Sequence, residues 1–543
     1  MPLTNCVRFF GPSREQPEPI SPIARQEVCH AFSSVLGPGT SLYPESIIAA
    51  PGGLLAAGRS PEGHVVIALG KPAEALASPA QQVAGLAWCV APAHADILAN
   101  LRAMVPWLRP VNGGLRTSFG FGDRLGLAGF GHIAALRRTD PQRQIFPILA
   151  QQSIRELTRT QRSGIDVIDA ATFACLATGW HHGYGADADH LKTPADVDAM
   201  MAAGFCFFTI DPSDYVDPEA DTCSEELATA RRQEIEQLPF FAGRRLHNEY
   251  ALRDFPIPRA DGSTLHVSFS EVQLDRAVAK YGRAVAHAAQ LAHHIARRAD
   301  DRQAPFEIEV SVDETAHPTT LAEHYFVASE LRRAGVRNLV SLAPRFVGEF
   351  EKGVDYRGDL HAFEQSLADH AAIAEALGPY KISVHSGSDK FAIYPTLARL
   401  THGRLHVKTA GTSYLEALRC IARCETALFR SIIRHSRRRF ETDRATYHIS
   451  AVLNTVTPPE DLSDTELERV YLDLDAGRQI LHVTFGSILT AKRAGGPPMF
   501  LREIQNTLTQ HEALHADILA QHLGKHLSGI LQQTPPVTAS AHG

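Results

Sequence analysis

The stretch Phe306-Glu-Ile-Glu-Val-Ser-Val-Asp-Glu-Thr315 has the pattern of a short apolar strand that ends in polar residues. Lys381-Ile-Ser-Val-His-Ser-Gly-Ser-Asp-Lys390 and Leu405-His-Val-Lys-Thr-Ala-Gly411 repeat this pattern later in the chain. Four further stretches share it: Ala186-Asp-Ala-Asp-His-Leu-Lys192, Phe207-Phe-Thr-Ile-Asp-Pro-Ser-Asp214, Leu339-Val-Ser-Leu-Ala-Pro-Arg345 and Tyr447-His-Ile-Ser450. Polar residues at the ends of successive strands are typical of the active-site mouth of a β/α barrel.

Amphipathic helical patterns separate these strands, for example over residues 196–203, 272–298 and 361–377. Strands that alternate with helices favour a parallel sheet joined by right-handed crossovers. The sequence therefore predicts an α/β fold, a TIM-like (β/α)8 barrel with an N-terminal α/β extension and C-terminal helices.

The pattern of apolar and polar residues divides the 543-residue chain into several regions. We predict an N-terminal α/β region over 1–115 and the barrel over 116–455. Residues 218–264 interrupt the alternation with charged and proline-bearing sequence, so we interpret them as an insertion on a barrel loop that could serve as a lid. A helical region follows over 456–532, and we expect the tail 533–543 to be disordered.

The composition is that of an ordinary globular enzyme. Hydrophobic residues make up 44% and charged residues 21% of the chain, and the formal net charge is only −7. These values disfavour disorder, and the lack of a dense basic patch disfavours nucleic acid as a partner. The chain has no uncharged apolar stretch of about 18 residues, so we expect no membrane span. Residues 1–10 lack the basic-then-apolar layout of a signal peptide, so secretion is disfavoured as well. Eight cysteines without a C-x-x-C pair indicate reduced thiols and a cytoplasmic protein. A homo-oligomer is compatible with this composition.

Three histidines at or near strand ends could share a metal ion. His190 follows Asp189, and His385 and His406 lie on two strands that are consecutive in sequence and therefore neighbours in a barrel. Imidazole nitrogens suit Zn²⁺, Mn²⁺ or Co²⁺, and three protein ligands with an open position are usual in a catalytic site. The alternative is that the three are hydrogen-bonded histidines without a metal.

Carboxylates and cations occupy further strand ends. Asp313-Glu314 and Glu349-Phe-Glu351 stand where a general acid or base would be needed, and the alternation of a strand points Asp313 and Glu314 in different directions. Salt bridges to nearby cations are the alternative. The cations expected at the same mouth are Lys192, Arg345, Lys390 and Lys408. Such a cluster suits a substrate that bears a carboxylate, although one buried lysine could instead form a Schiff base.

Two motif matches favour a structural interpretation. His511-Glu-Ala-Leu-His515 fits the H-E-x-x-H template of zinc peptidases, but the later His522 does not fit the extended form of that motif. Gly120-Phe-Gly-Asp-Arg-Leu-Gly126 matches neither the dinucleotide nor the P-loop spacing, so we expect a tight turn at the barrel entry.

Several long strings resemble the tagaturonate/fructuronate epimerase family. They are Ser311-Val-Asp-Glu-Thr315, Leu342-Ala-Pro-Arg-Phe-Val-Gly-Glu-Phe-Glu-Lys-Gly-Val-Asp-Tyr356, Val384-His-Ser-Gly-Ser-Asp-Lys-Phe391 and His406-Val-Lys-Thr-Ala-Gly-Thr-Ser413. The resemblance runs from about Arg116 to the C-terminal helices. It implies a metal-dependent epimerase of hexuronate catabolism that interconverts D-tagaturonate and D-fructuronate by inverting C4.

The chemistry of C4 then suggests roles for the polar residues. The C4 hydrogen is not acidic, so a retro-aldol and aldol route is expected, with a divalent cation (Zn, Mn, Co or Ni) on the C2 carbonyl. The roles we assign are as follows: His190, His385 and His406 hold the metal, Asp189 accepts and Glu314 donates the proton, and Glu351 is the reserve for either. Lys192, Arg345, Lys390 or Lys408 would bind the C6 carboxylate of the sugar acid, and Ser386 and Asp389 its hydroxyls.

Two other functions remain open on the sequence. A metal-dependent aldolase or ketose isomerase would use the same enediolate chemistry. A non-catalytic sugar-acid-binding protein would need the binding residues but no acid and base beside the metal.

Overall fold

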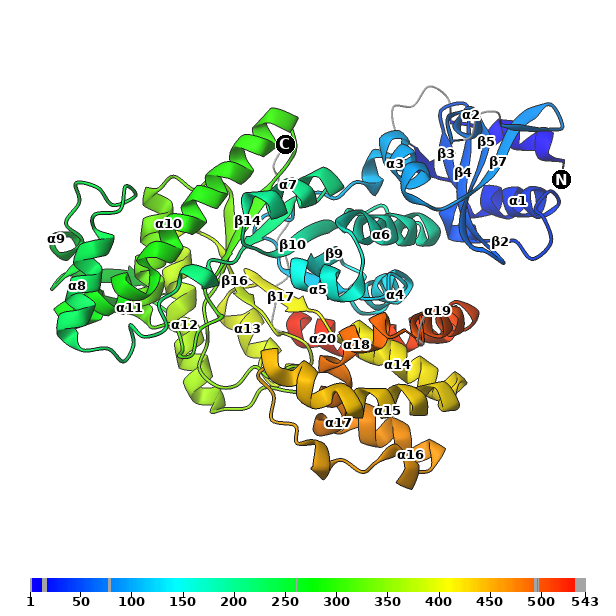
Figure 1. Ribbon diagram of the computed structural model, residues 1–543. Helices are drawn as coiled ribbons and strands as arrows, with labels where there is room; N and C mark the ends of the chain where they lie inside the picture. The colour runs from blue at the N-terminus through cyan, green and yellow to red at the C-terminus, as the bar shows by residue number, and fades with distance from the viewer. Residues whose placement is uncertain are drawn as a thin grey trace.

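Eight parallel strands close into a barrel in the computed structural model, which describes residues 2–11, 17–76, 80–259, 261–492, 496 and 498–532 (Figure 1). The strands are, in chain order, β8 (Ser118–Gly122), β9 (Phe146–Ser153), β10 (Gly185–Leu191), β11 (Phe207–Ile210), β14 (Glu307–Ser311), β15 (Leu339–Ala343), β16 (Lys381–Val384) and β17 (Leu405–Thr409). Each pairs in parallel with the next along the chain, and β17 pairs with β8 to close the ring. The predicted TIM-like barrel is confirmed.

Two local predictions about this barrel need correction. The glycine-rich run is a turn only in its second half: residues 120–122 end strand β8, and residues 124–126 form a bend after it. A Cβ on Gly120 would lie 1.5 Å from Gln151 Oε1, so the Gln151 side chain fills the space beside this glycine. The stretch Tyr447–Ser450 forms no strand. Since β8 already pairs with β17, no open edge remains to which it could add.

Helices on the outside of the barrel follow the strands: α4 (Gly129–Thr139), α6 (Gly164–Thr178), α7 (Pro194–Ala203), α10 (Glu271–Arg302), α11 (Leu321–Arg333), α12 (Leu360–Leu377), α13 (Tyr394–Leu400) and α14 (Thr412–Cys424). Four of them begin with a capping box in which a Ser or Thr hydroxyl and the third helical side chain satisfy each other's backbone N–H groups. The helix starts are therefore encoded locally.

The N-terminal region is a separate antiparallel sheet. Its strands are β1 (Glu18–Pro19), β2 (Ser41–Leu42), β3 (Ile48–Ala50), β4 (Gly53–Ser60), β5 (Gly63–Gly70), β6 (Gln81–Val83) and β7 (Leu86–Pro92), with α1 (Pro22–Ser33), α2 (Lys71–Leu76) and α3 (Ala95–Met104) packed on them. This unit lies against α6 on the flank of the barrel, where His64 stacks on Phe173 with ring centroids 4.2 Å apart (Figure 1).

The predicted insertion lies between β11 and α10. It contains α8 (Glu225–Ile235), α9 (Leu246–Tyr250) and the hairpin of β12 (Asp254–Pro258) and β13 (Thr264–Ser268). The insertion packs on α10, α11 and α12 at the outer wall of the barrel (Figure 1). None of its described residues lines the cavity at the barrel mouth, so it is not a lid in this structure.

The C-terminal region is helical and has a hydrophobic core of its own. It comprises α15 (Thr426–Asp443), α16 (Asp464–Glu468), α17 (Asp475–Val483), α18 (Phe485–Thr490), α19 (Leu501–Gln510) and α20 (Glu512–Leu531). Helix α20 packs along α4 and against α13 and α14, so it returns to the barrel wall. The tail 533–543, for which we expected disorder, lies outside the described residues. None of the described helices combines the length and apolar character needed to cross a membrane.

Gly131 sets the distance between α4 and α20, because a Cβ there would lie 2.4 Å from the Cβ of Leu519. We expect Gly131→Ala to lower the free energy of unfolding by about 1–3 kcal/mol through overpacking, as measured by urea denaturation. The matched control is Gly37→Ala, where an added Cβ meets no atom within 4 Å. Equal stability of the two variants would contradict this account of the contact.

Candidate functional site

A lysine surrounded by carboxylates lies at the centre of the barrel. The Lys408 Nζ is 2.8 Å from Asp187 Oδ2, 2.7 Å from Asp189 Oδ1 and 2.9 Å from Glu309 Oε1. The alternation along β10, β14 and β17 turns all four side chains inward, and all four are buried. Burial disfavours the ammonium form, but the three carboxylates outweigh it and hold the pKa of Lys408 well above its usual value.

Above this lysine, Asp189, His190 and His385 form a group whose ligand atoms lie within 4.8 Å of one another. His385 Nε2 lies 2.7 Å from Glu309 Oε1, which fixes the ring. Its buried Nδ1 makes no hydrogen bond and lies 3.5 Å from Asp313 Oδ1. His190 Nδ1 is 3.2 Å from Asp211 Oδ2. A histidine held by a carboxylate through one nitrogen, with its other nitrogen available, is the usual arrangement of a metal-ligating imidazole.

The backbone and the electrostatics support the same group. His190 and the neighbouring Ser386 have φ values of +55° and +53°, which are costly for residues with side chains and gather at functional sites. Burial opposes protonation of His190, but Asp189 and Asp211 raise the pKa of this imidazole to about 10. The site therefore attracts positive charge.

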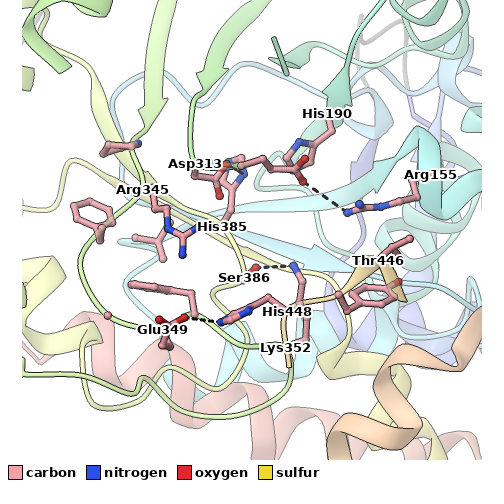
Figure 2. A pocket seen from close by; sticks show the side chains of 17 residues that line it. Arg155, His190, Asp313, Arg345, Glu349, Lys352, His385, Ser386, Thr446 and His448 are labelled. Carbon is pink, nitrogen blue, oxygen red and sulfur yellow. Dashed lines mark hydrogen bonds and ion pairs between the residues drawn. The ribbon is translucent and has the colours of Figure 1, made fainter. Parts of the chain in front are cut away.

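A cavity of about 220 Å³ opens above these residues and narrows to an inner chamber of about 50 Å³. Figure 2 shows the side chains that surround the outer cavity. Residues that follow different strands contribute: Arg155 after β9, His190 on β10, Asp313 and Glu314 after β14, Arg345, Glu349 and Lys352 after β15, and His385 and Ser386 after β16. The C-terminal segment adds Thr446, Tyr447 and His448, and His448 Nε2 lies 2.6 Å from Glu349 Oε2.

Among the residues assigned to the metal, His406 lies elsewhere. It stands two residues before Lys408 on the same inward face of β17, one layer deeper in the barrel, and it is fully buried. Its Nδ1 is 2.9 Å from Ser118 Oγ. His190 and His385 lie above Lys408, whereas His406 lies one layer below it. The structure therefore does not bring the three imidazoles together, because they are too far apart along the barrel axis to bind one ion.

Asp389 and Lys390 also lie outside the cavity. Asp389 Oδ2 is 2.8 Å from Arg478 Nη2 and its Oδ1 is 2.5 Å from His522 Nε2, so this carboxylate joins the loop after β16 to the C-terminal helices. Asp389, His522 and His526 also form a group of cation-ligand type, but Arg478 already supplies the positive charge there. The Lys390 ammonium donates hydrogen bonds to the carbonyl oxygens of Glu351, Val354 and Ser388. These contacts correct the expectation of substrate binding and indicate a structural role.

The remaining predicted residues divide between the cavity and its surroundings. Glu314, Arg345 and Ser386 line the outer cavity, and Asp189 and Lys408 line the inner chamber. The Lys192 ammonium lies outside both and pairs with Asp214 at 2.5 Å. Glu351, the reserve acid or base, is buried and accepts hydrogen bonds from Gln479 and Ser450, so it too is structural.

The sequence analysis missed several residues at the site. Glu309 and Asp211 had a detectable signal, because Glu309 shares the inward-facing alternation of β14 and Asp211 ends β11. Arg124 and Arg155 follow the first two barrel strands, and no strand-end pattern had been recognised there. The H-E-x-x-H match is structural, as expected: Glu512 accepts a hydrogen bond from Tyr43 and so holds the N-terminal sheet against α20.

Comparisons with known proteins agree with this geometry. The family model of tagaturonate epimerase (UxaE) matches residues 55–530. A tagaturonate/fructuronate epimerase of Thermotoga maritima is 39% identical over 503 residues, which cover 92% of this chain and 99% of that protein. The chain belongs to the tagaturonate epimerase family. The resemblance found in the sequence is thereby confirmed.

Solved structures of the tagaturonate epimerase family also match. Fructuronate-tagaturonate epimerase UxaE from Cohnella laeviribosi, in its native crystal structure and in one with one glycerol bound, gives a TM-score of 0.83 at 35% identity. Each match covers 94% of this chain and 99% of the other. The N-terminal sheet and the C-terminal helices are therefore part of the family architecture.

The charge balance around Lys408 leads to a prediction for metal-free protein. We expect Lys408→Met to lower the free energy of unfolding at neutral pH by about 3–5 kcal/mol, because it leaves buried carboxylates without their cation. Burial by itself raises the pKa of Asp189 and Glu309, but Lys408 lowers both below their ordinary values. In the wild type they therefore stabilise the fold above their unfolded pKa and lose this effect as the pH falls through the lowered folded pKa.

In the variant, only the neighbouring histidines still oppose burial, so both pKa values rise relative to the wild type. The deficit should therefore shrink as the pH falls toward about 4. Urea denaturation at several pH values measures it. Lys192→Met, which removes a half-exposed cation, is the control and should cost under about 1 kcal/mol. A deficit that does not change with pH would contradict this explanation.

Proposed function

We propose that this protein interconverts D-tagaturonate and D-fructuronate by inverting the configuration at C4. Membership of the tagaturonate epimerase family supports the substrate. The observation that carries the chemistry is the buried Nδ1 of His385, which makes no hydrogen bond and lies beside Asp189, His190 and, at 3.5 Å, Asp313 Oδ1. It faces a cavity lined by carboxylates and cations.

The residues present fit a divalent metal ion. Asp189, His190 and His385 would hold it, with Glu309 and Asp211 orienting the two imidazoles from behind. Two nitrogens and one carboxylate oxygen suit Zn, Mn, Co or Ni, and they leave positions for substrate. Bound there, the ion would act as a Lewis acid on the C2 ketone and stabilise the charge that develops when the C3–C4 bond breaks.

A retro-aldol and aldol route follows from the substrate. C4 lies β to both the C2 ketone and the C6 carboxylate, so its hydrogen is not acidic and cannot be exchanged by simple deprotonation. Cleavage of the C3–C4 bond gives an aldehyde at C4, whose two faces can then be attacked. The protein must remove the C4 hydroxyl proton, keep the fragments together while the aldehyde turns, and return the proton.

Proton transfer at the C4 oxygen is assigned to carboxylates that face the cavity. Glu314 lines it with a side chain that is 41% exposed, and Arg155 lies 3.9 Å away, so this carboxylate can reach substrate. Asp313 lines the same cavity from the adjacent position and serves the other epimer. We assign Asp189 to the metal and no longer to proton acceptance. Despite burial, Lys408 and the two histidines keep the pKa of this carboxyl below its ordinary value, so it stays ionised.

The decisive experiment uses metal-free protein and D-tagaturonate. We expect no D-fructuronate without added metal and restored epimerisation with Zn²⁺, Mn²⁺, Co²⁺ or Ni²⁺, as followed by chromatography. Three-carbon products would identify an aldolase instead. Ligand binding without turnover with any of the metals would identify a sugar-acid-binding protein and refute the proposal.

A second experiment tests the role of Glu314. Glu314→Gln keeps the shape of the side chain but cannot accept a proton, so we expect kcat to fall by about 10²- to 10⁴-fold. The melting temperature should stay unchanged, because Glu314 is half-exposed. Metal content is measured alongside, because Glu314 also forms a group with His190 and Asp211, and a loss of metal would assign Glu314 to the metal instead. Glu349→Gln, at another carboxylate of the cavity wall, is the control. An unchanged kcat in Glu314→Gln would overturn the assignment.

A further inference from the structure

The inner chamber has an excess of positive charge. Its charged lining residues are Arg124, Arg155, Lys352, Lys408, Glu156 and Asp189. Lys408 is already neutralised by the three carboxylates around it, one of which is Asp189. Arg155 also lines the outer cavity and lies 3.9 Å from Glu314 there. Arg124 and Lys352 therefore remain against the single carboxylate of Glu156, in a space with room for a few water molecules or one carboxylate group.

Two nitrogens of the Arg124 guanidinium bind a carboxylate, and the third has no partner. Its Nε and Nη2 lie 2.9 Å and 2.8 Å from Glu156 Oε1, and its guanidinium stacks 3.6 Å from the ring centre of Phe485 on α18. The side chain is only 2% exposed, and its Nη1 is buried without a hydrogen-bond partner. A buried, unpaired donor of a charged group is costly, so its position indicates a ligand that completes it.

Lys352 is the second cation of the inner chamber. Its Nζ lies 2.5 Å from Ser386 Oγ, and no carboxylate among the described residues lies within 4.0 Å of it. Burial, together with the nearby Arg155, lowers the pKa of this ammonium. An anion bound beside Lys352 would relieve both effects.

The outer cavity does not show this excess. There Arg155 and Arg345 face the carboxylates Asp313, Glu314 and Glu349, and Lys352 lines both spaces. The Arg345 guanidinium also donates a hydrogen bond to the Thr315 carbonyl. Charge thus distinguishes two parts of one site: the outer part suits hydroxyl groups and proton transfer, and the inner part suits an anion.

We propose that Arg124 and Lys352 form a subsite for the carboxylate of the substrate. The inference rests on the proposed function and specifies where the acidic end of the sugar lies. One carboxylate oxygen accepts from Arg124 Nη1 and the other from Lys352 Nζ. This anchors the carboxylate-bearing fragment beside the Asp189–His190–His385 group while its aldehyde turns, so the fragment is retained without blocking its rotation.

The subsite depends on the C-terminal helices. Phe485 supports the Arg124 guanidinium, and His482 of α17 and Tyr447 line the same chamber. Recognition of an acidic rather than a neutral sugar is therefore built jointly by the barrel and the region that follows it.

The test compares binding of D-tagaturonate and its neutral counterpart D-tagatose to metal-loaded protein by calorimetry, alongside KM for D-tagaturonate. We expect Lys352→Met and Arg124→Lys to weaken D-tagaturonate binding by about 10- to 100-fold, the loss typical of one hydrogen bond to a charged group. D-tagatose binding should change by less than about threefold, since the neutral sugar makes no charge-assisted bond there. Lys352→Arg should restore part of the loss.

Arg345→Met is the matched control, because it removes a cation from the outer cavity only. A loss specific to the acidic sugar in Arg345→Met, but not in Lys352→Met, would place the carboxylate in the outer cavity and overturn the proposal. Equal weakening of both sugars in Lys352→Met would overturn it as well. If D-tagatose does not bind measurably, D-tagaturonate affinity alone tests the proposal. It should fall in Lys352→Met, recover in part in Lys352→Arg, and fall less in Arg345→Met.

The outcome is separable from that of the proposed function. A wild-type protein without epimerase activity refutes the function, yet calorimetry still reports whether the acidic sugar needs Arg124 and Lys352. Should Arg124→Lys fail to fold, because Arg124 is packed between Glu156 and Phe485, the Lys352 variants carry the test.

Discussion

The ion cluster around Lys408 is the interaction on which the rest of the site depends. Three carboxylates inside a barrel cannot stay ionised without a cation, because each loses its hydration on burial. Lys408 provides that cation and leaves Glu309 able to bind His385 Nε2. The imidazole is thereby held with Nδ1 toward the cavity, beside Asp189 and His190. A charge in the barrel interior thus determines which nitrogen faces a metal ion.

Charge is also what divides the cavity. Near the loops after β14 and β15, cations and carboxylates balance, as proton transfer between substrate and protein requires. In the inner chamber the balance shifts to positive, since Arg124 Nη1 has no hydrogen-bond partner and Lys352 has no carboxylate within 4.0 Å among the described residues. The C-terminal helices are needed for this arrangement: His482 lines the chamber, Phe485 supports the Arg124 guanidinium, and Asp389 ties the β16 loop to Arg478. The large second core beneath them gives these contacts a rigid base.

Much of the fold could be predicted because strand periodicity and polar strand ends are local properties. The polar strand ends placed Glu314, Ser386 and His385 at the mouth, where the structure has them. The same reasoning failed for Asp389 and Lys390, which lie only a few residues beyond a strand end. There the chain has already turned away, and the partners of both side chains come from distant loops and from α17 and α20. His406 shows a related limit of prediction from sequence. A position on a strand indicates that the side chain points into the barrel, but not how deep in the barrel it lies relative to a metal ligand.

The sequence by itself determined the class of fold, the family and the residue types of the site, since hydrophobic alternation, helix caps and long characteristic strings are all written along the chain. Only the tertiary structure decided which charges neutralise one another. Lys408 and Lys352 look alike in the sequence, but one is enclosed by three carboxylates and the other faces the cavity without one. The physical reason is that the properties of an ionised group depend on neighbours within a few ångströms, and in a closed barrel those neighbours come from strands far apart in the chain.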